Sequence, residues 1–153
     1  MRNHIAKYLG LAENAEKTLV KAFVKLSSQH AFEPDAVEMF EKFALWSKQH
    51  LDFIGKLSAE FEPEKNDEPE EVFDSLLLRP RMGPLGLLRD LHGLSVLVHE
   101  TQMCWIVLLQ ASRALRNSEM EMICLECGVH FKKETMWLLT KIKTAAPQIL
   151  VVA

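Results

Sequence analysis

The sequence contains little cysteine, glycine or proline, and it has no long uninterrupted apolar run. Its 153 residues include 3 cysteines, 6 glycines and 6 prolines. The odd number of cysteines, and an N-terminus MRNHIAKYLGLAE without a secretory h-region, argue against a disulfide framework. We therefore expect a reducing, cytoplasmic setting. No apolar run approaches the ~20 residues that a membrane span needs, so we expect no such span.

An excess of charge of one sign is also lacking. The formal net charge is −3, which provides no basic surface for nucleic acid. The sequence also lacks a glycine-rich phosphate loop and a G-x-S-x-G nucleophile elbow, which excludes the enzyme classes that depend on them. Hydrophobic residues make up 48% of the chain, enough for one soluble globular domain spanning residues 1–153.

Four long stretches carry apolar residues at alternating spacings of three and four, the pattern of helices that bury one face. The third is about 30 residues long, or roughly 45 Å as a helix. The sequence therefore predicts an all-α four-helix bundle, with helices at about Asn3–His30, Asp35–Phe61, Gly86–Leu115 and Ser118–Pro147.

The connections between the predicted helices and the C-terminal tail also carry recognisable sequence patterns. Residues 62–84 contain four prolines and a run of acids. They predict a long crossover between two parallel helices, with one short helical turn through Val72–Leu78, although an acidic disordered linker is the alternative. Ser118 and Glu121 predict a capping box at the last helix. The apolar tail Ile149–Ala153 predicts packing along the bundle or across a homodimer contact.

Inward polar residues occur near the midpoint of every predicted helix. Helices of similar length bring their midpoints to one level, so the sequence predicts a polar layer in the core. Buried carboxylates are costly unless they are paired, protonated or bound to a metal. The layer therefore supplies candidate metal ligands, which are Glu16, His50, Glu100, Glu134 and, on the shoulder of the last helix, His130.

Two helical hairpins around a long crossover, with inward Glu and His at mid-helix, resemble the ferritin-like superfamily, including its small uncharacterised and rubrerythrin-like members. The resemblance implies an up-down four-helix bundle. Di-iron members carry Glu, Glu-x-x-His, Glu and Glu-x-x-His on successive helices. Glu16, His50 and Glu100 match that pattern. The motif is degenerate, because three ligand positions hold Ser47, Phe131 and Glu134.

The degenerate motif leaves two interpretations open. Two irons about 3.5–4 Å apart need more donors than these residues supply, which argues against a standard di-iron oxidase. A single Fe, Mn or Zn ion would make the chain a metal-dependent oxidoreductase or a peroxide-handling protein. A vestigial layer without metal would leave a non-catalytic module that binds a protein partner or a small ligand. The cofactor, and whether the chain is an enzyme, stay open between these two.

Other candidate residues have simpler explanations. Cys124 and Cys127 with His130 have the spacing of a metal or redox triplet. On a helix, however, two cysteines three residues apart share the buried face, and cysteine is often a small core residue. His92 and His99 share the polar stripe of the third helix, so we expect both to be solvated.

Overall fold

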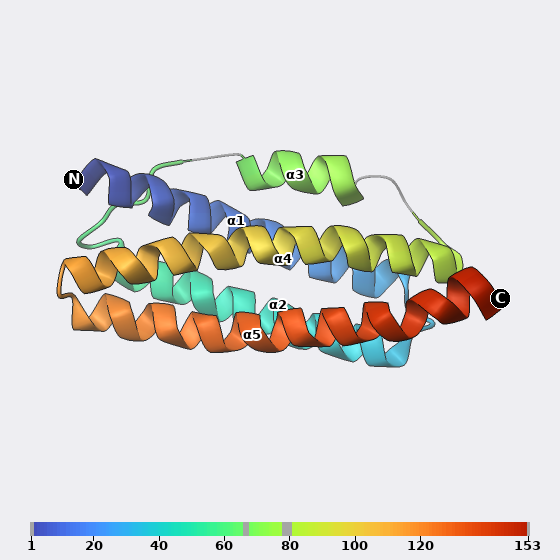
Figure 1. Ribbon diagram of the computed structural model, residues 1–153. Coiled ribbons are helices and arrows are strands. Elements are labelled where there is room, and N and C mark those ends of the chain that lie inside the picture. Colours follow the sequence, from blue (N-terminus) through green and yellow to red (C-terminus); the bar gives the residue numbers. More distant parts are fainter. Residues whose placement is uncertain (1, 66–67, 78–80, 153) are drawn as a thin grey trace.

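The computed structural model describes residues 2–65, 68–77 and 81–152, and within these ranges the chain forms helices and no strand. The all-helical prediction is confirmed. In chain order the elements are α1 (Arg2–Gln29), α2 (Pro34–Leu57), α3 (Glu68–Leu77), α4 (Gly83–Ala114), α5 (Ser118–Pro147) and a terminal π-helical turn, η1 (Gln148–Val152) (Figure 1).

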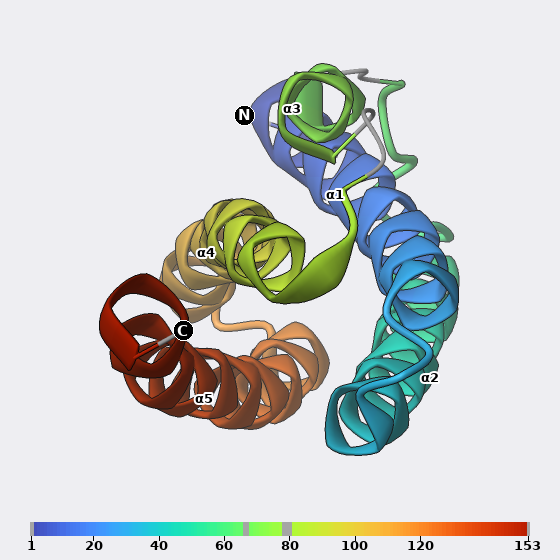
Figure 2. The ribbon, with the colours of Figure 1, turned by 90° about the vertical axis from the view of Figure 1, so that its right-hand side faces the viewer.

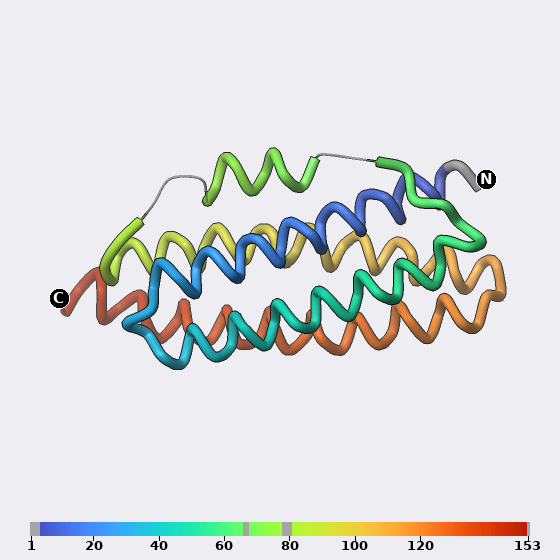
Figure 3. The backbone as a smooth tube through the Cα atoms, turned by 180° about the vertical axis from the view of Figure 1, so that it is seen from behind, coloured from blue at the N-terminus to red at the C-terminus, as the bar shows by residue number. Residues whose placement is uncertain are grey.

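The four long helices form two antiparallel hairpins, α1 with α2 and α4 with α5 (Figures 1 and 3). Viewed along their axes, these helices surround one core, and α3 lies outside it against α1 and α4 (Figure 2). The connection that carries α3 returns along the length of the bundle, so α2 and α4 run in the same direction. This is the path expected of a crossover over residues 62–84.

The crossover is more ordered than predicted. Its helix α3 spans ten residues, Glu68–Leu77, rather than a single turn. Three acidic residues in the first turn of α3 stabilise the helix by interacting with the positive end of its dipole. Phe73 and Leu77, one turn apart, are buried against the bundle. Leu78, the end of the predicted turn, lies outside the described residues.

The start of α5 differs from the prediction. Asn117, not Ser118, is the N-cap residue, and its side chain accepts a hydrogen bond from the Met120 N–H at 3.1 Å. Asparagine is among the best N-cap residues, because its side-chain oxygen satisfies a free helix N–H. The predicted capping box between Ser118 and Glu121 was therefore wrong. The predicted end of the helix at Pro147 is confirmed.

An aromatic cluster fills the half of the core nearest the α1–α2 turn. Phe23 packs against Phe40 and Phe43, with ring centroids 6.2 and 5.7 Å apart, and Trp137 of α5 meets both α2 rings edge-on. Edge-to-face pairs add to the stabilisation from area burial. The cluster lies on one side of the polar layer of the core, and it holds α2 against α5 there.

Two strongly apolar segments are the helix α4 and the terminal turn η1. By length and composition α4 is apolar enough to cross a membrane, as the core helix of a soluble bundle can also be, so the expectation of no membrane span stays a prediction. The turn η1 contacts α4 and α5, yet Leu150, Val151 and Val152 stay 65%, 82% and 72% exposed. Ala153 lies outside the described residues.

Candidate functional site

The centre of the bundle holds a chain of hydrogen-bonded side chains to which each long helix contributes one residue. Glu16 of α1 and His50 of α2 are fully buried. Oε1 of Glu16 lies 3.2 Å from the indole Nε1 of Trp105 on α4 and 3.1 Å from Nδ1 of His50. Nε2 of His50 lies 2.8 Å from Nδ1 of His130 on α5. The predicted polar layer is therefore present for these residues.

The proton positions in this chain follow from its partners. The indole N–H of Trp105 can only donate, so Oε1 of Glu16 accepts from it. Burial, followed by the charges of His50 and Lys133, lowers the pKa of His130 to about 4. Its ring is therefore neutral at pH 7. Oε1 of Glu16 accepts from Nδ1 of His50 as well, whereas the direction of the bond between His50 and His130 depends on which ring nitrogen carries the proton.

His130 is held in position by Trp46 of α2. The two rings stack with centroids 4.4 Å apart and an interplanar angle of 4°. The ammonium groups of Lys42 and Lys133 lie over the Trp46 ring at 5.2 and 5.9 Å. The stack fixes the orientation of the imidazole, and the charge of Lys133 disfavours its protonation.

Glu134 occupies the same layer without a partner. It lies one helical turn beyond His130 and is fully buried. Within the described part of the chain, neither of its carboxyl oxygens has a hydrogen-bond partner, nor do Oε2 of Glu16 and Oγ of Ser47. Burial, and then the charge of Glu16, raise the pKa of Glu134 well above its usual value. The raised pKa favours the protonated, neutral form of Glu134.

Glu100 lies at the edge of the layer. Its side chain is half-buried, and burial, followed by the charge of Glu68 on α3, raises its pKa. These neighbours place Glu100 on the side of α4 that faces the crossover. The sequence predicted an inward carboxylate at this position, whereas Glu100 is only half-buried and senses the charge of Glu68 outside the core.

The predicted ligands do not fit a metal centre as they are arranged. Across residues 2–65, 68–77 and 81–152, no three His, Cys, Asp or Glu side chains are placed to hold a metal ion. Both ring nitrogens of His50 are engaged, and two N–H groups point at Oε1 of Glu16. Phe131 packs on the His50 ring with centroids 5.3 Å apart, where the family pattern has a glutamate. No catalytic step through a metal follows from this geometry.

The cysteines are buried thiols. Burial raises the pKa of Cys104 and of Cys124 to about 12, and it raises the pKa of Cys127 further. The thiolate, which is the nucleophile and the metal ligand, is therefore scarce at pH 7. This favours core packing over a metal or redox triplet for Cys124 and Cys127.

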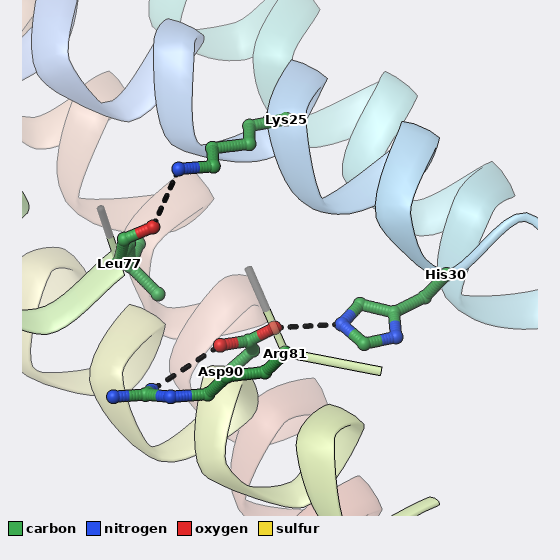
Figure 4. Close-up of polar contacts among 5 residues, drawn as sticks. All are labelled: Lys25, His30, Leu77, Arg81 and Asp90. Carbon is green, nitrogen blue, oxygen red and sulfur yellow. Dashed lines mark hydrogen bonds and ion pairs between the residues drawn. The ribbon is translucent and has the colours of Figure 1, made fainter. Parts of the chain in front are cut away.

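A second buried cluster, which was not predicted from the sequence, lies just beyond the C-terminal end of α1. The carboxylate of Asp90 on α4 lies between the ring of His30 and the guanidinium of Arg81 (Figure 4). Oδ2 of Asp90 is 2.7 Å from Nε2 of His30, and Oδ1 is 3.2 Å from Nη1 of Arg81. The clip joins α1, the crossover and α4. Periodicity alone could have flagged Asp90, because Leu87, Asp90, Leu91 and Leu94 share one helix face.

Surface hollows lie elsewhere on the molecule. A groove of about 510 Å³ runs between α1 and α2, with Phe23 and Phe40 at its base and Val24 and Leu45 at its rim. Its lining includes no member of the polar layer. The groove and the hydrogen-bonded chain are therefore separate features.

In comparisons with known proteins, no protein-family model, no curated protein and no solved structure matches this chain.

Proposed function

We propose that this chain is a ferritin-like bundle with a degenerate site, acting as a non-catalytic structural or binding module in the cytoplasm. The observation that carries the proposal is the closed chain of Trp105, Glu16, His50 and His130. Its contacts engage both ring nitrogens of His50 and one oxygen of Glu16, atoms that a metal would need. The three cysteines of the protein are free thiols, which suits a reducing compartment.

The hydrogen-bonded chain also explains why a carboxylate is tolerated in the core. A buried carboxyl group without partners is costly, whereas one that accepts two hydrogen bonds is not. Trp105 and His50 supply those two bonds to a single oxygen of Glu16. The layer thus joins all four helices and contributes to a unique packing arrangement, a role known for buried polar networks.

The second candidate function is a mononuclear Fe- or Mn-dependent oxidoreductase. One observation favours it: four oxygens of the layer, from Glu16, Ser47 and Glu134, are buried without a partner in the described chain. Carboxylate and hydroxyl oxygens are donors for hard cations. Binding would require Glu134 to lose its proton and the chain through His50 to rearrange.

Metal content separates the two functions. The protein is purified without chelators, offered Fe(II), Mn(II) and Zn(II) without oxygen, dialysed and analysed for bound metal. We expect far less than one ion per chain, and a thermal midpoint that the metals leave unchanged, because only a ligand of the native state raises it.

Glu16→Gln is the diagnostic variant, since glutamine keeps an oxygen for Trp105 and His50 but loses the charge. Asp52→Asn on the exposed face of α2 is the control. About one ion per chain in the wild-type protein and in Asp52→Asn, lost in Glu16→Gln, would establish the metal-dependent alternative and refute the non-catalytic proposal.

A further inference from the structure

The face of α5 that points away from the core is apolar. Five of its hydrophobic side chains are exposed: Met122 (71%), Leu125 (45%), Val129 (54%), Met136 (59%) and Leu139 (53%). We call these five residues the outer seam. Met122, Val129 and Met136 are seven residues apart, and Leu125 and Leu139 are two heptads apart. This is the a and d spacing of a helix that packs along another helix.

The opposite face of α5 already packs into the bundle. Its buried residues, among them Cys127, Phe131 and Leu138, face the core. Within the described chain the elements that contact α5 are α2, α4 and η1. A helix with apolar residues on both faces is typically covered on both faces. The outer seam is therefore a surface for another helix.

Charge along α5 is divided between its two halves. Residues 118–131 carry Glu119, Glu121 and Glu126 and no lysine or arginine, whereas all four lysines of α5, Lys132, Lys133, Lys141 and Lys143, lie in residues 132–147. A second α5 helix running in the opposite direction would bring acidic and basic halves together. A parallel helix would oppose like charges.

We propose that the outer seam binds a second copy of this chain, with the two α5 helices antiparallel about a twofold axis near residues 130 and 131. This register stacks Met122 on Leu139 of the second copy, and Leu125 on Met136. Val129 meets Lys132, whose aliphatic stem covers it while the ammonium group reaches solvent. A twofold interface is self-complementary, so each of these contacts occurs twice.

The same register pairs charges beside the seam. In antiparallel helix pairs, the positions that follow d on each helix face each other across one edge of the interface. These positions hold Glu126 and Lys133, so Glu126 of each copy lies beside Lys133 of the other. This complementarity selects a second copy over a lipid surface, because the acidic half of α5 would be repelled by anionic phospholipid.

The inference deepens the proposed function by naming what the module binds. It concerns the outer face of α5, and among the residues it uses only Lys133 also lies near the polar layer, over the Trp46 ring. Its failure would therefore leave the metal result unaffected. It also differs from the dimer predicted from the tail, since it uses none of the residues after Pro147.

Exchanging the charges of Glu126 and Lys133 tests the proposed register of the two α5 helices. Sedimentation equilibrium should show a dimer of the wild-type chain at micromolar concentration. Glu126→Lys or Lys133→Glu alone places like charges together twice, and the dissociation constant should rise about tenfold. The double variant should restore the wild-type value. Asp52→Lys, an equal change of charge on the exposed face of α2, should leave the dissociation constant unchanged.

Cysteine cross-linking tests whether the two α5 helices are antiparallel. The native cysteines are buried, so an introduced surface thiol reports alone. Val129→Cys lies next to the twofold axis and should form a covalent dimer under mild oxidation. Met122→Cys should not, because its two copies lie roughly 25 Å apart along the axis of an antiparallel pair. In a parallel pair both variants would cross-link.

Three results would overturn the proposal. The first is a monomer throughout the micromolar range. The second is a double charge variant no tighter than the single variants. The third is a wild-type monomer that binds vesicles of phosphatidylserine and phosphatidylcholine. Since every substitution lies on the exposed face, circular dichroism serves to show that each variant is folded.

Discussion

The two carboxyl groups buried in the polar layer have opposite surroundings. Glu16 accepts two N–H groups on one oxygen, whereas both oxygens of Glu134 lack a partner within the described residues. Burial therefore acts unopposed on Glu134, and its pKa is raised. The prediction from the sequence that the layer holds Glu16 and Glu134 is right in position, but the raised pKa of Glu134 favours its neutral form.

Glu134→Gln should make folding stability less dependent on pH. Below about pH 4.5, the usual value for a glutamate, the group is protonated in both folded and unfolded chains, so wild type and variant should match. Above it the unfolded wild-type chain releases a proton that the folded chain keeps. Wild-type stability should then fall relative to the variant by up to about 1.4 kcal/mol per pH unit.

Urea unfolding at several pH values measures this difference. By pH 7 the variant should be more stable by about 1–3 kcal/mol. Glu38→Gln on the exposed face of α2 is the control, and it should stay within about 0.5 kcal/mol of wild type. A loss of stability in Glu134→Gln at pH 7 would mean that the carboxyl group is ionised and paired, which favours the metal-dependent alternative.

At the scale of the elements, the crossover depends on one close approach to α1. The N–H of Glu64 donates to the carbonyl of Ala6 at 3.0 Å, and the Glu64 backbone passes directly over Gly10. A Cβ atom at Gly10 would overlap the Glu64 carbonyl. Glycine is required there because of space and not because of helix propensity.

Gly10→Ala and Gly55→Ala should therefore have opposite effects. Both glycines lie inside helices, where alanine is favoured by about 0.5–1 kcal/mol. Nothing lies within 4 Å of a Cβ at Gly55, so that variant should be stabilised. Gly10→Ala should lose about 1–3 kcal/mol, as overpacked sites do. Thermal unfolding of the two variants measures both signs. Stabilisation of both would show that the crossover does not dock on α1.

At the scale of the whole molecule, the Asp90 clip holds the hairpins and the crossover together. His30 and Asp90 are almost fully buried, and Arg81 reaches them from the segment before α4. Lys25 adds a contact to the carbonyl of Leu77 at the end of α3 at 2.6 Å (Figure 4). Three segments distant in sequence thus meet near one end of the bundle.

Asp90→Asn should destabilise the fold by roughly 3 kcal/mol, because asparagine keeps only one acceptor oxygen for His30 and Arg81, turns an NH2 group toward the other partner, and removes the charge that pairs with Arg81. Asp74→Asn on exposed α3 is the matched control and should change stability by less than about 0.5 kcal/mol. Urea unfolding of both variants makes the comparison. An equal, small effect of the two substitutions would show that the clip contributes little.

The sequence predicted what depends on local periodicity. The four long helices follow from the three-and-four spacing, and the inward positions of Glu16, His50 and Glu134 follow from the same spacing. The direction of the hydrogen bonds could not be predicted, because it depends on which side-chain atoms meet across helices. The Asp90 clip was missed because its partners lie 60 and 9 residues away. The Asn117 cap was missed because the adjacent Ser118 offered a plausible motif.

The hydrogen-bonded chain has an indole ring at each end. Trp105 donates to Glu16 at the buried end, and Trp46 stacks on His130 at the other. A protonated imidazole quenches the light that a stacked indole emits, while the emission wavelength of a buried indole follows the polarity around its N–H. Intrinsic fluorescence therefore reports on the polar layer without a label. Acidification should lower the emission intensity of Trp46, and an ion that enters beside Glu16 should shift the emission wavelength of Trp105.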